Sequence, residues 1–308
     1  SRLSLLAILM TTLLVPSSVS AFALSPSSLE LTGKRGETVI SSITILNTQN
    51  VDTEYYIGLM GFQPKDDTGA PEFYTTETGS YELANWILFE NDSFVVPAFS
   101  ASEVSFKVVV PDDVLSQGYF AAITVSPAPS DVVASNGAII EAKTAALVFL
   151  TVQGETEERL ELLVFVSSGS GDVFDLLTRR YEFRLQNQGN VHVTPAGTIR
   201  LTGFFGQTVL EYDANHEDGR VLPSSTRKFS VVEEEGNSMS WYNTVAFQMS
   251  HLAIGPVTAT LDLTYGESGT IQSSLSFWLF PWQLMVTLLG LAIALRILYW
   301  FLRQKRYN

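Results

Sequence analysis

The chain contains no cysteine and only three histidines among its 308 residues. Without cysteine there is neither a thiol nucleophile nor a disulfide, so an exported domain of this sequence must be stabilised by its hydrophobic core. The histidines, at positions 192, 216 and 251, stand apart from one another and show no metal-ligand spacing. The sequence therefore predicts ordinary strand or loop histidines, and we expect no cofactor.

Familiar catalytic motifs are also missing. The sequence contains no H-E-x-x-H, no G-x-S-x-G and no G-x-x-x-x-G-K-[ST] pattern. The adjacent carboxylates at 66–67 and 112–113 fall in turn-like segments, where aspartate commonly hydrogen-bonds the backbone. We therefore expect a protein that is not an enzyme. A hydrolase with catalytic residues dispersed along the chain is the enzymatic alternative.

Positive charge is scarce. The chain has 18 Lys and Arg against 32 Asp and Glu, for a formal net charge of −14. Every acidic residue lies between Glu30 and Glu267. An acidic surface of this kind keeps a domain soluble and repels nucleic acid and anionic lipid. The composition thus predicts that nucleic acid is not a partner.

The chain has one long hydrophobic run, FWLFPWQLMVTLLGLAIALRILYWFL at 277–302. As a helix rising ~1.5 Å per residue, this run is long enough to cross a hydrocarbon core of about 30 Å. Aromatic residues stand at both of its ends, and basic residues, which tend to stay cytoplasmic, follow it. The sequence predicts a transmembrane helix over 275–302, lipid contact through 277–302 and a cytoplasmic tail at 303–308.

Residues 1–23 have the pattern of a signal peptide. A basic residue at position 2 precedes an apolar run at 3–15, and an A-x-A cleavage site follows at 21–23, with 19–21 as the alternative. Export directed by this peptide, followed by one C-terminal stop-transfer helix, predicts a single-pass type I protein of the cell membrane with an extracellular ectodomain. Cysteine-free exported modules favour a bacterial origin.

Between these two ends, short strand-like segments alternate with turn residues. The clearest is 102–110, which places Val104, Phe106, Val108 and Val110 on one face and the residues at 105, 107 and 109 on the other. Later strand-like segments are 160–166, 181–185, 198–201, 208–212, 228–232, 241–249 and 255–265. A tight hairpin at 203–207 is expected to join two of them.

This spacing, without a long helical period outside the ends, predicts an all-β fold. We expect two tandem immunoglobulin-like β-sandwiches, at 24–153 and 154–274, followed by a single C-terminal transmembrane α-helix. The few residues before the apolar run predict a hairpin turn at 266–269 and a returning edge strand at 270–277. The second sandwich would then stand almost directly on the bilayer, and its acidic surface would avoid anionic headgroups.

Several short sequence segments resemble those of a known family. They are VVVP at 108–111 and GYFAAI at 118–123, then NQGNVHV at 187–193, GTI at 197–199 and FG at 205–206. Together with the order of signal peptide, two sandwiches, membrane helix and basic tail, they resemble WxL-interacting proteins of Gram-positive cell surfaces. That resemblance implies a first domain associated with peptidoglycan and a second that binds host or surface proteins. Periplasmic pilus chaperones share comparable strand-and-turn phrases.

Aromatic residues are the stronger indication of binding, since rings stack on sugars and anchor protein contacts. Phe73, Tyr74 and Tyr81 lie among Gly, Thr and Pro in the segment 64–81, without strand periodicity. A long insertion of this kind is often functional. We predict that these three residues form the partner-binding surface.

The segment Asp213-Ala214-Asn215-His216-Glu217-Asp218-Gly219 is the one metal candidate. Oxygen ligands at alternate positions suit a hard cation such as Ca²⁺. The glycine, however, is one position late for an EF-hand, and position 224 is serine instead of glutamate. An ordinary polar loop is therefore the favoured interpretation, and we predict no metal site.

Taken together, these patterns favour a membrane-anchored extracellular adhesion or scaffold protein. It would bind cell-wall glycan or another surface protein through non-catalytic β-sandwich modules. The alternative is an exported chaperone or assembly factor that pairs a partner strand with an exposed sheet edge. An adhesin should use loops or faces, whereas a chaperone should use an edge.

Overall fold

The computed structural model describes residues 22–76, 82–127, 143–169, 179–232 and 240–304. The chain divides into two compact units. The first holds the described residues up to Phe62 and within Phe73–Leu115 and Tyr119–Gln153. The second holds Gln63–Glu72, Ser116–Gly118 and the chain from Gly154 onward. Each unit is described separately.

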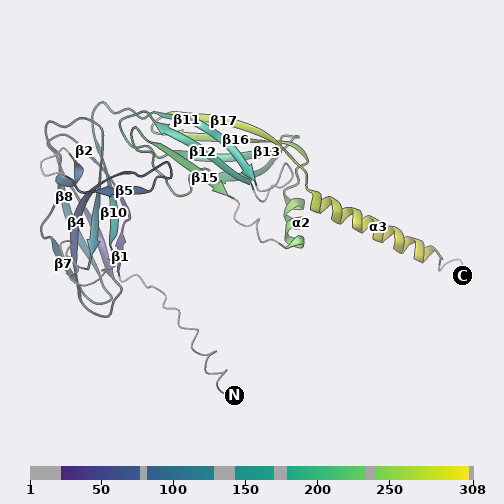
Figure 1. Cartoon of the computed structure of the whole chain (residues 1–308), viewed down its shortest axis with the longest axis horizontal. Helices are drawn as coiled ribbons and strands as arrows, with labels where there is room; N and C mark the ends of the chain where they lie inside the picture. The colour runs from purple at the N-terminus through teal and green to yellow at the C-terminus, as the bar shows by residue number, and fades with distance from the viewer. Residues whose placement is uncertain (1–21, 77–81, 128–142, 170–178, 233–239, 305–308) are drawn as a thin grey trace, which may run out of the picture. The chain divides into compact units, whose positions relative to one another are not determined.

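Two sheets form the first unit (Figure 1). One has the order β1-β3-β8-β6, formed by Phe22–Ser25, Thr38–Asn47, Ala101–Val109 and Ile87–Phe89. The other has the order β2-β10-β9-β4-β5, formed by Ser28–Gly33, Thr144–Val152, Gly118–Ser126, Thr53–Pro64 and Pro71–Tyr74. β7 (Ser93–Val96) also pairs with β4, and a short 3-10 helix, η1 (Leu83–Asn85), precedes β6.

The core of the first unit lies between these sheets. Val104, Phe106 and Val108 of β8 are buried, as their alternation in the sequence predicts, while the residues between them are exposed. They join Ile123 of β9 and Val148 of β10 in one apolar cluster. Inward apolar and outward polar residues on alternating positions are what a sandwich requires.

The second unit is also a sandwich. Its three-stranded sheet has the order β11-β12-β15, formed by Leu160–Gly169, Arg179–Asn187 and Thr226–Val232. Its four-stranded sheet has the order β14-β13-β16-β17, formed by Thr208–Asp213, Ala196–Thr202, Gly255–Tyr265 and Gly269–Leu279. A shared apolar cluster includes Phe183 of one sheet and Leu261 of the other. The predicted all-β fold of immunoglobulin-like sandwiches with one C-terminal apolar helix is confirmed.

The C-terminal helix, α3, spans Trp282–Gln304 and is long and apolar enough to cross a membrane. Its 23 residues correspond to a length of about 35 Å at 1.5 Å per residue. The expected helix start near 275–277 is wrong, because β17 continues to Leu279. The hairpin turn before β17 is confirmed, since Tyr265 is paired with Gly269.

A second helix, α2 (Trp241–Ser250), occupies the segment predicted as the strand 241–249. That prediction is wrong. The hydroxyl of Ser240 caps the helix by accepting a hydrogen bond from the Asn243 N–H at 3.4 Å. Thr244 and Gln248, one helical turn apart, form its buried side.

Candidate functional site

The predicted binding residues Phe73 and Tyr74 lie in a strand, not in a loop. They end β5, all four residues of which are exposed. β5 is the last strand of its sheet and neighbours only β4 among the strands that the structure describes. Tyr81, the third predicted residue, lies outside the described residues.

Three contacts fix how β4 and β5 face each other. The Lys65 N–H donates to the Ala70 carbonyl at 2.9 Å, and the Gln63 amide donates to the Glu72 carboxylate at 3.0 Å. Further along, the rings of Phe62 and Phe73 meet edge to face, with centroids 6.5 Å apart. Residues 65 and 70, 63 and 72, and 62 and 73 are therefore opposite one another in an antiparallel hairpin.

This register determines which backbone groups of β5 point outward. In an antiparallel ladder, opposed pairs alternate between those that exchange hydrogen bonds and those whose N–H and C=O groups point away from each other. The pair Phe62 and Phe73 is three positions from the hydrogen-bonded pair Lys65 and Ala70. It is therefore a pair whose N–H and C=O groups point away from each other. The backbone N–H and C=O of Phe73 therefore point to the free edge of the sheet.

Phe73 is the member nearest the sheet edge in a cluster of four phenylalanines. Phe62, Phe120 and Phe149 contact one another, with ring centroids 5.6 Å apart between Phe62 and Phe149, 5.9 Å between Phe149 and Phe120, and 6.1 Å between Phe120 and Phe62. Phe73 joins them through Phe62, at 6.5 Å. These residues come from β10, β9, β4 and β5 in turn. Phe62 and Phe149 are buried, whereas Phe73 is 39% exposed. The cluster therefore presents one accessible ring, that of Phe73, at the open edge.

Tyr74 lies on the opposite face of the same strand. A side chain built on Gly61 of β4 would come within 2.4 Å of the Tyr74 ring, so the ring covers this glycine. Partial burial raises the pKa of the Tyr74 phenol. Gly61 and Phe62 are consecutive strand residues that face opposite sides of the sheet, as do Tyr74 and Phe73. The two rings therefore cannot form one flat platform, but together they flank the edge.

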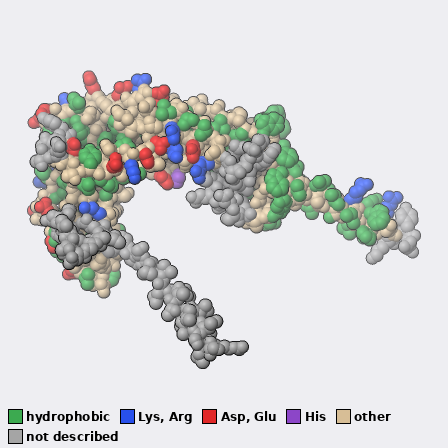
Figure 2. Space-filling model, in the orientation of Figure 1, with side chains coloured by type: hydrophobic (Ala, Val, Ile, Leu, Met, Phe, Trp, Pro, Cys, Tyr) green, Lys and Arg blue, Asp and Glu red, His purple; other side chains and the backbone are tan. Residues whose placement is uncertain are grey.

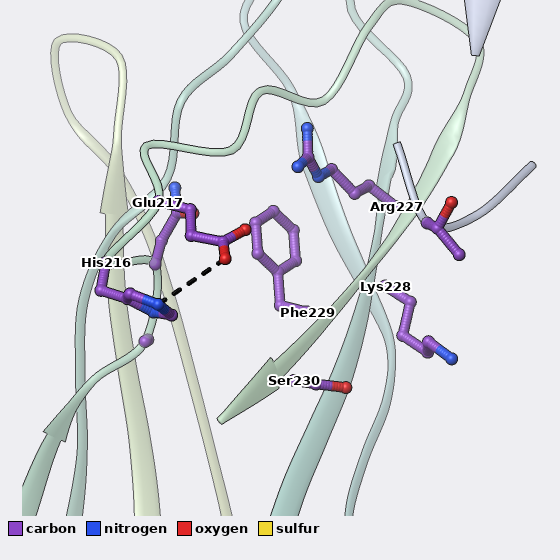
Figure 3. A pocket seen from close by; sticks show the side chains of 9 residues that line it. His216, Glu217, Arg227, Lys228, Phe229 and Ser230 are labelled. Atoms are coloured by element: carbon purple, nitrogen blue, oxygen red, sulfur yellow. Dashed lines mark ion pairs between the residues drawn. The ribbon is translucent and has the colours of Figure 1, made fainter. Parts of the chain in front are cut away.

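A hollow of about 260 Å³ lies in the second unit. It is lined by Thr68, Ala214, Asn215, His216, Glu217, Arg227, Lys228, Phe229 and Ser230. Figure 3 shows His216 and Glu217 on one side of the Phe229 ring and Arg227 and Lys228 on the other. The lining therefore combines one carboxylate, Glu217, with two cationic side chains, Arg227 and Lys228.

Arg227 is held firmly at this hollow. Its guanidinium carbon lies 5.5 Å from the centroid of the Phe229 ring, and its Nη1 donates to the Arg220 carbonyl at 2.9 Å. Burial lowers the pKa of the Arg227 guanidinium, while the charge of Glu217 acts in the opposite direction. His216 and Glu217 approach each other to 3.8 Å. The buried Nε of Arg227 has no hydrogen-bond partner among the described residues.

The calcium candidate at 213–219 is shaped by Asn215. The buried amide of Asn215 donates to the carbonyls of Pro195 at 2.8 Å and Gly219 at 3.0 Å, and its oxygen accepts the Gly219 N–H at 2.7 Å. The Asp213 carboxylate accepts the Asn215 N–H at 2.8 Å. Within the described part of the chain, no three metal-ligating side chains of the His, Cys, Asp or Glu type gather. The geometry is that of a polar loop closed by hydrogen bonds.

Comparison with known proteins gives likeness in structure only. No family model matches the sequence, and no curated protein matches it either. Similar solved structures include the class 5 fimbriae chaperone CfaA, with 10% identity, a TM-score of 0.41 and coverage of 82% of this chain and 98% of that chain. The YadV chaperone has 11% identity, a TM-score of 0.39 and coverage of 83% and 99%.

The E. coli chaperone DraB has 12% identity, a TM-score of 0.34 and coverage of 82% of this chain and 95% of that chain. At these identities and TM-scores the likenesses identify neither a family nor a partner for this chain. The resemblance to WxL-interacting proteins stays a prediction.

Proposed function

We propose that this chain is an exported, membrane-anchored assembly factor or chaperone that binds another polypeptide by accepting a strand at the β5 edge. Recognition at a sheet edge combines main-chain hydrogen bonds with contacts to alternate side chains. The observation that carries the proposal is the arrangement at Phe73. Its backbone N–H and C=O point to the free edge, its ring lies on one face, and the Tyr74 ring lies on the other.

An added strand fits this arrangement better than a sugar. Alternate residues of an added strand point to opposite faces, so its side chains would reach Phe73 on one face and Tyr74 on the other. On the Phe73 face, an apolar side chain would pack against Phe73 and enlarge the phenylalanine cluster. A sugar stacks on rings that share one surface, and these two rings do not.

The membrane anchor in this proposal is α3. Its apolar side chains are almost all exposed, which is costly in water and favourable in lipid. Arg303 lies in its last turn, at the end expected to face the cytoplasm. In this orientation the sandwiches lie on the outer side of the membrane.

The test compares a peptide probe with a glycan probe, using the full chain in detergent micelles. The peptide probe is an array of 12-residue peptides in which apolar and polar residues alternate. Peptides of the same composition, with all apolar residues grouped together, are the comparison on the same array. The glycan probe is purified peptidoglycan, assayed by co-sedimentation. We expect binding to alternating peptides, weakened about 30-fold by Phe73→Ala if the ring anchors the contact.

The matched control is Leu88→Ala, which removes an exposed apolar side chain from β6 in the other sheet of the first unit. It should leave peptide binding unchanged. A different result would favour the glycan-binding adhesin instead. In that case the unmodified chain would co-sediment with peptidoglycan, Phe73→Ala would not, and neither would bind the alternating peptides.

A further inference from the structure

Helix α2 packs Phe247 against the apolar cluster of the second unit, but it also buries two polar side chains and exposes three large apolar ones. Thr244 and Gln248 are buried, whereas Trp241, Tyr242 and Met249 are exposed, Tyr242 to 79%. A surface helix in water normally turns its large apolar side chains inward. The medium around α2 is therefore expected to be less polar than water.

Contacts attach α2 to the start of α3. The Gln248 side-chain oxygen accepts the backbone N–H of Leu284 at 3.0 Å, and Trp241 Nε1 donates to the Thr287 hydroxyl at 3.1 Å. The rings of Trp241 and Trp282 meet edge to face with centroids 5.5 Å apart. The helix consequently lies at the level where α3 begins.

A second exposed apolar element is the tip of the β13–β14 hairpin. The turn is closed by a hydrogen bond from the Gly203 N–H to the Gln207 carbonyl at 2.9 Å, as its predicted tight hairpin requires. Gly206 has a positive φ of 80°, which suits glycine. The tip presents Phe204 and Phe205, and Phe205 is 86% exposed.

Strand register places this tip at the same end of the second unit as the start of α3. Thr202 is opposite Thr258, and Thr258 is opposite Ser276. Beyond Thr202 the hairpin continues toward its tip, while β17 continues from Ser276 in the same direction toward Trp278 and α3. Since strands rise about 3.3 Å per residue, Phe204 lies near the level of Trp278.

The charge pattern distinguishes this end from the rest of the protein. Residues 236–261 include no Asp, Glu, Lys or Arg, in a chain whose formal net charge is −14. Leu252 and Ile254, which follow α2, are exposed as well. Figure 2 shows hydrophobic side chains gathered where α3 begins.

We propose that this end of the second unit is a membrane-binding surface that inserts into the headgroup region of the bilayer crossed by α3. The interfacial surface consists of Phe204, Phe205, Tyr242, Met249, Leu252 and Ile254. Aromatic and aliphatic side chains at the headgroup level, without charge, are typical of elements that lie in the membrane interface. The inference rests on the membrane anchorage by α3 proposed above.

The consequence concerns how the second unit is held. A single helix with a flexible stalk would let the unit tilt freely, whereas β17 enters α3 directly and α2 and the hairpin tip add two further contacts with lipid. The uncharged end thus faces the bilayer, and the acidic parts of the surface are kept away from the headgroups.

The absence of cysteine makes a direct measurement practical. Single-cysteine variants of the full chain would carry a nitroxide spin label in phosphatidylcholine–phosphatidylglycerol vesicles. Tyr242→Cys and Phe205→Cys report on the interfacial surface, and Leu291→Cys reports on α3. Ser268→Cys, in the turn between β16 and β17 at the other end of these strands, is the matched aqueous control. Accessibility to oxygen, which enters lipid, is compared with accessibility to a water-soluble nickel chelate.

We expect the ratio of oxygen to nickel accessibility at Tyr242→Cys and Phe205→Cys to exceed that at Ser268→Cys several-fold and to approach that at Leu291→Cys. Aqueous values at both positions, with a lipid value at Leu291→Cys, overturn the interfacial surface and leave the anchor intact. An aqueous value at Leu291→Cys overturns the anchor and, with it, this inference. Shielding of both positions from both reagents would indicate contact with a second copy of the chain and would also overturn it.

Discussion

Asn47 and Asn187 hold equivalent positions in the two sandwiches. Each is the last residue of its strand, β3 or β12, and each is fully buried. The amide of Asn47 donates to the Val51 carbonyl at 2.8 Å, and that of Asn187 donates to the Val191 carbonyl at 2.7 Å. Each side-chain oxygen accepts the backbone N–H two residues later. The same amide thus closes the same turn in both units.

Replacing either asparagine should destabilise its unit. In Asn47→Ala or Asn187→Ala, buried carbonyls lose their donors, and we expect the free energy of unfolding to fall by about 2–4 kcal/mol. Urea denaturation followed by circular dichroism measures the loss. Asn50→Ala, at an exposed position in the same turn as Asn47, is the control and should change stability by less than about 0.5 kcal/mol. Equal effects at Asn47 and Asn50 would contradict this role.

Processing of the N-terminus is expected after Ala21. Cleavage at the first predicted site, after Ala23, would remove Phe22, which is buried in the core with its ring centroid 4.9 Å from that of Tyr55. It would also remove half of β1, where Phe22 pairs with Asn47 of β3. We predict that the mature protein begins at Phe22. Mass spectrometry of the protein isolated from membranes decides this, and a mature N-terminus at Leu24 would refute it.

The carboxyl of Glu54 connects β4 with β7 in a pH-dependent way. Ser93 Oγ donates to it at 2.7 Å and the Tyr56 hydroxyl at 3.0 Å, and these bonds hold the pKa of Glu54 below its ordinary value, Ser93 contributing most. Because the folded pKa is lowered, this stabilisation is present above the unfolded pKa and is lost as pH falls through the folded pKa.

Ser93→Ala should therefore raise the pKa of Glu54 toward its ordinary value, as measured by carbon NMR of labelled glutamate carboxyls. Ser93→Thr retains the hydroxyl and serves as the control, with the lowered pKa preserved. An unchanged pKa in Ser93→Ala would show that the hydrogen bond does not form.

Local patterns were sufficient to predict much of the sandwich framework. The alternation of Val104, Phe106 and Val108 follows from the two-residue period of a strand, and the turn at 266–269 follows from its glycines. These features depend on residues close in sequence. The start of α3 could not be predicted in this way, because one apolar run serves first as the end of β17 and then as the helix.

The sites depended on pairing between distant segments. Aromatic and β-branched residues at 241–249 favour a strand. The segment nevertheless forms a helix, and the side chains of Gln248 and Trp241 on that helix hydrogen-bond to α3, which is distant in sequence. Phe73 and Tyr74 were recognised as binding candidates from composition. Their position at a sheet edge follows only from the strand order, in which β5 pairs with β4 at the end of the sheet.

The central claim, that a partner strand pairs with the outward backbone of β5, is tested most directly by comparing Phe73→Pro with Phe73→Ala. Both variants lose the ring, but only proline also loses the N–H at the free edge, and proline is tolerated on edge strands because no ladder bond inside the sheet is lost. Affinities for an alternating peptide are measured by fluorescence anisotropy with the full chain, and circular dichroism confirms folding. We predict that Phe73→Pro binds about tenfold more weakly than Phe73→Ala, the upper range for one backbone hydrogen bond. Equal affinities of the two folded variants would contradict strand addition at β5.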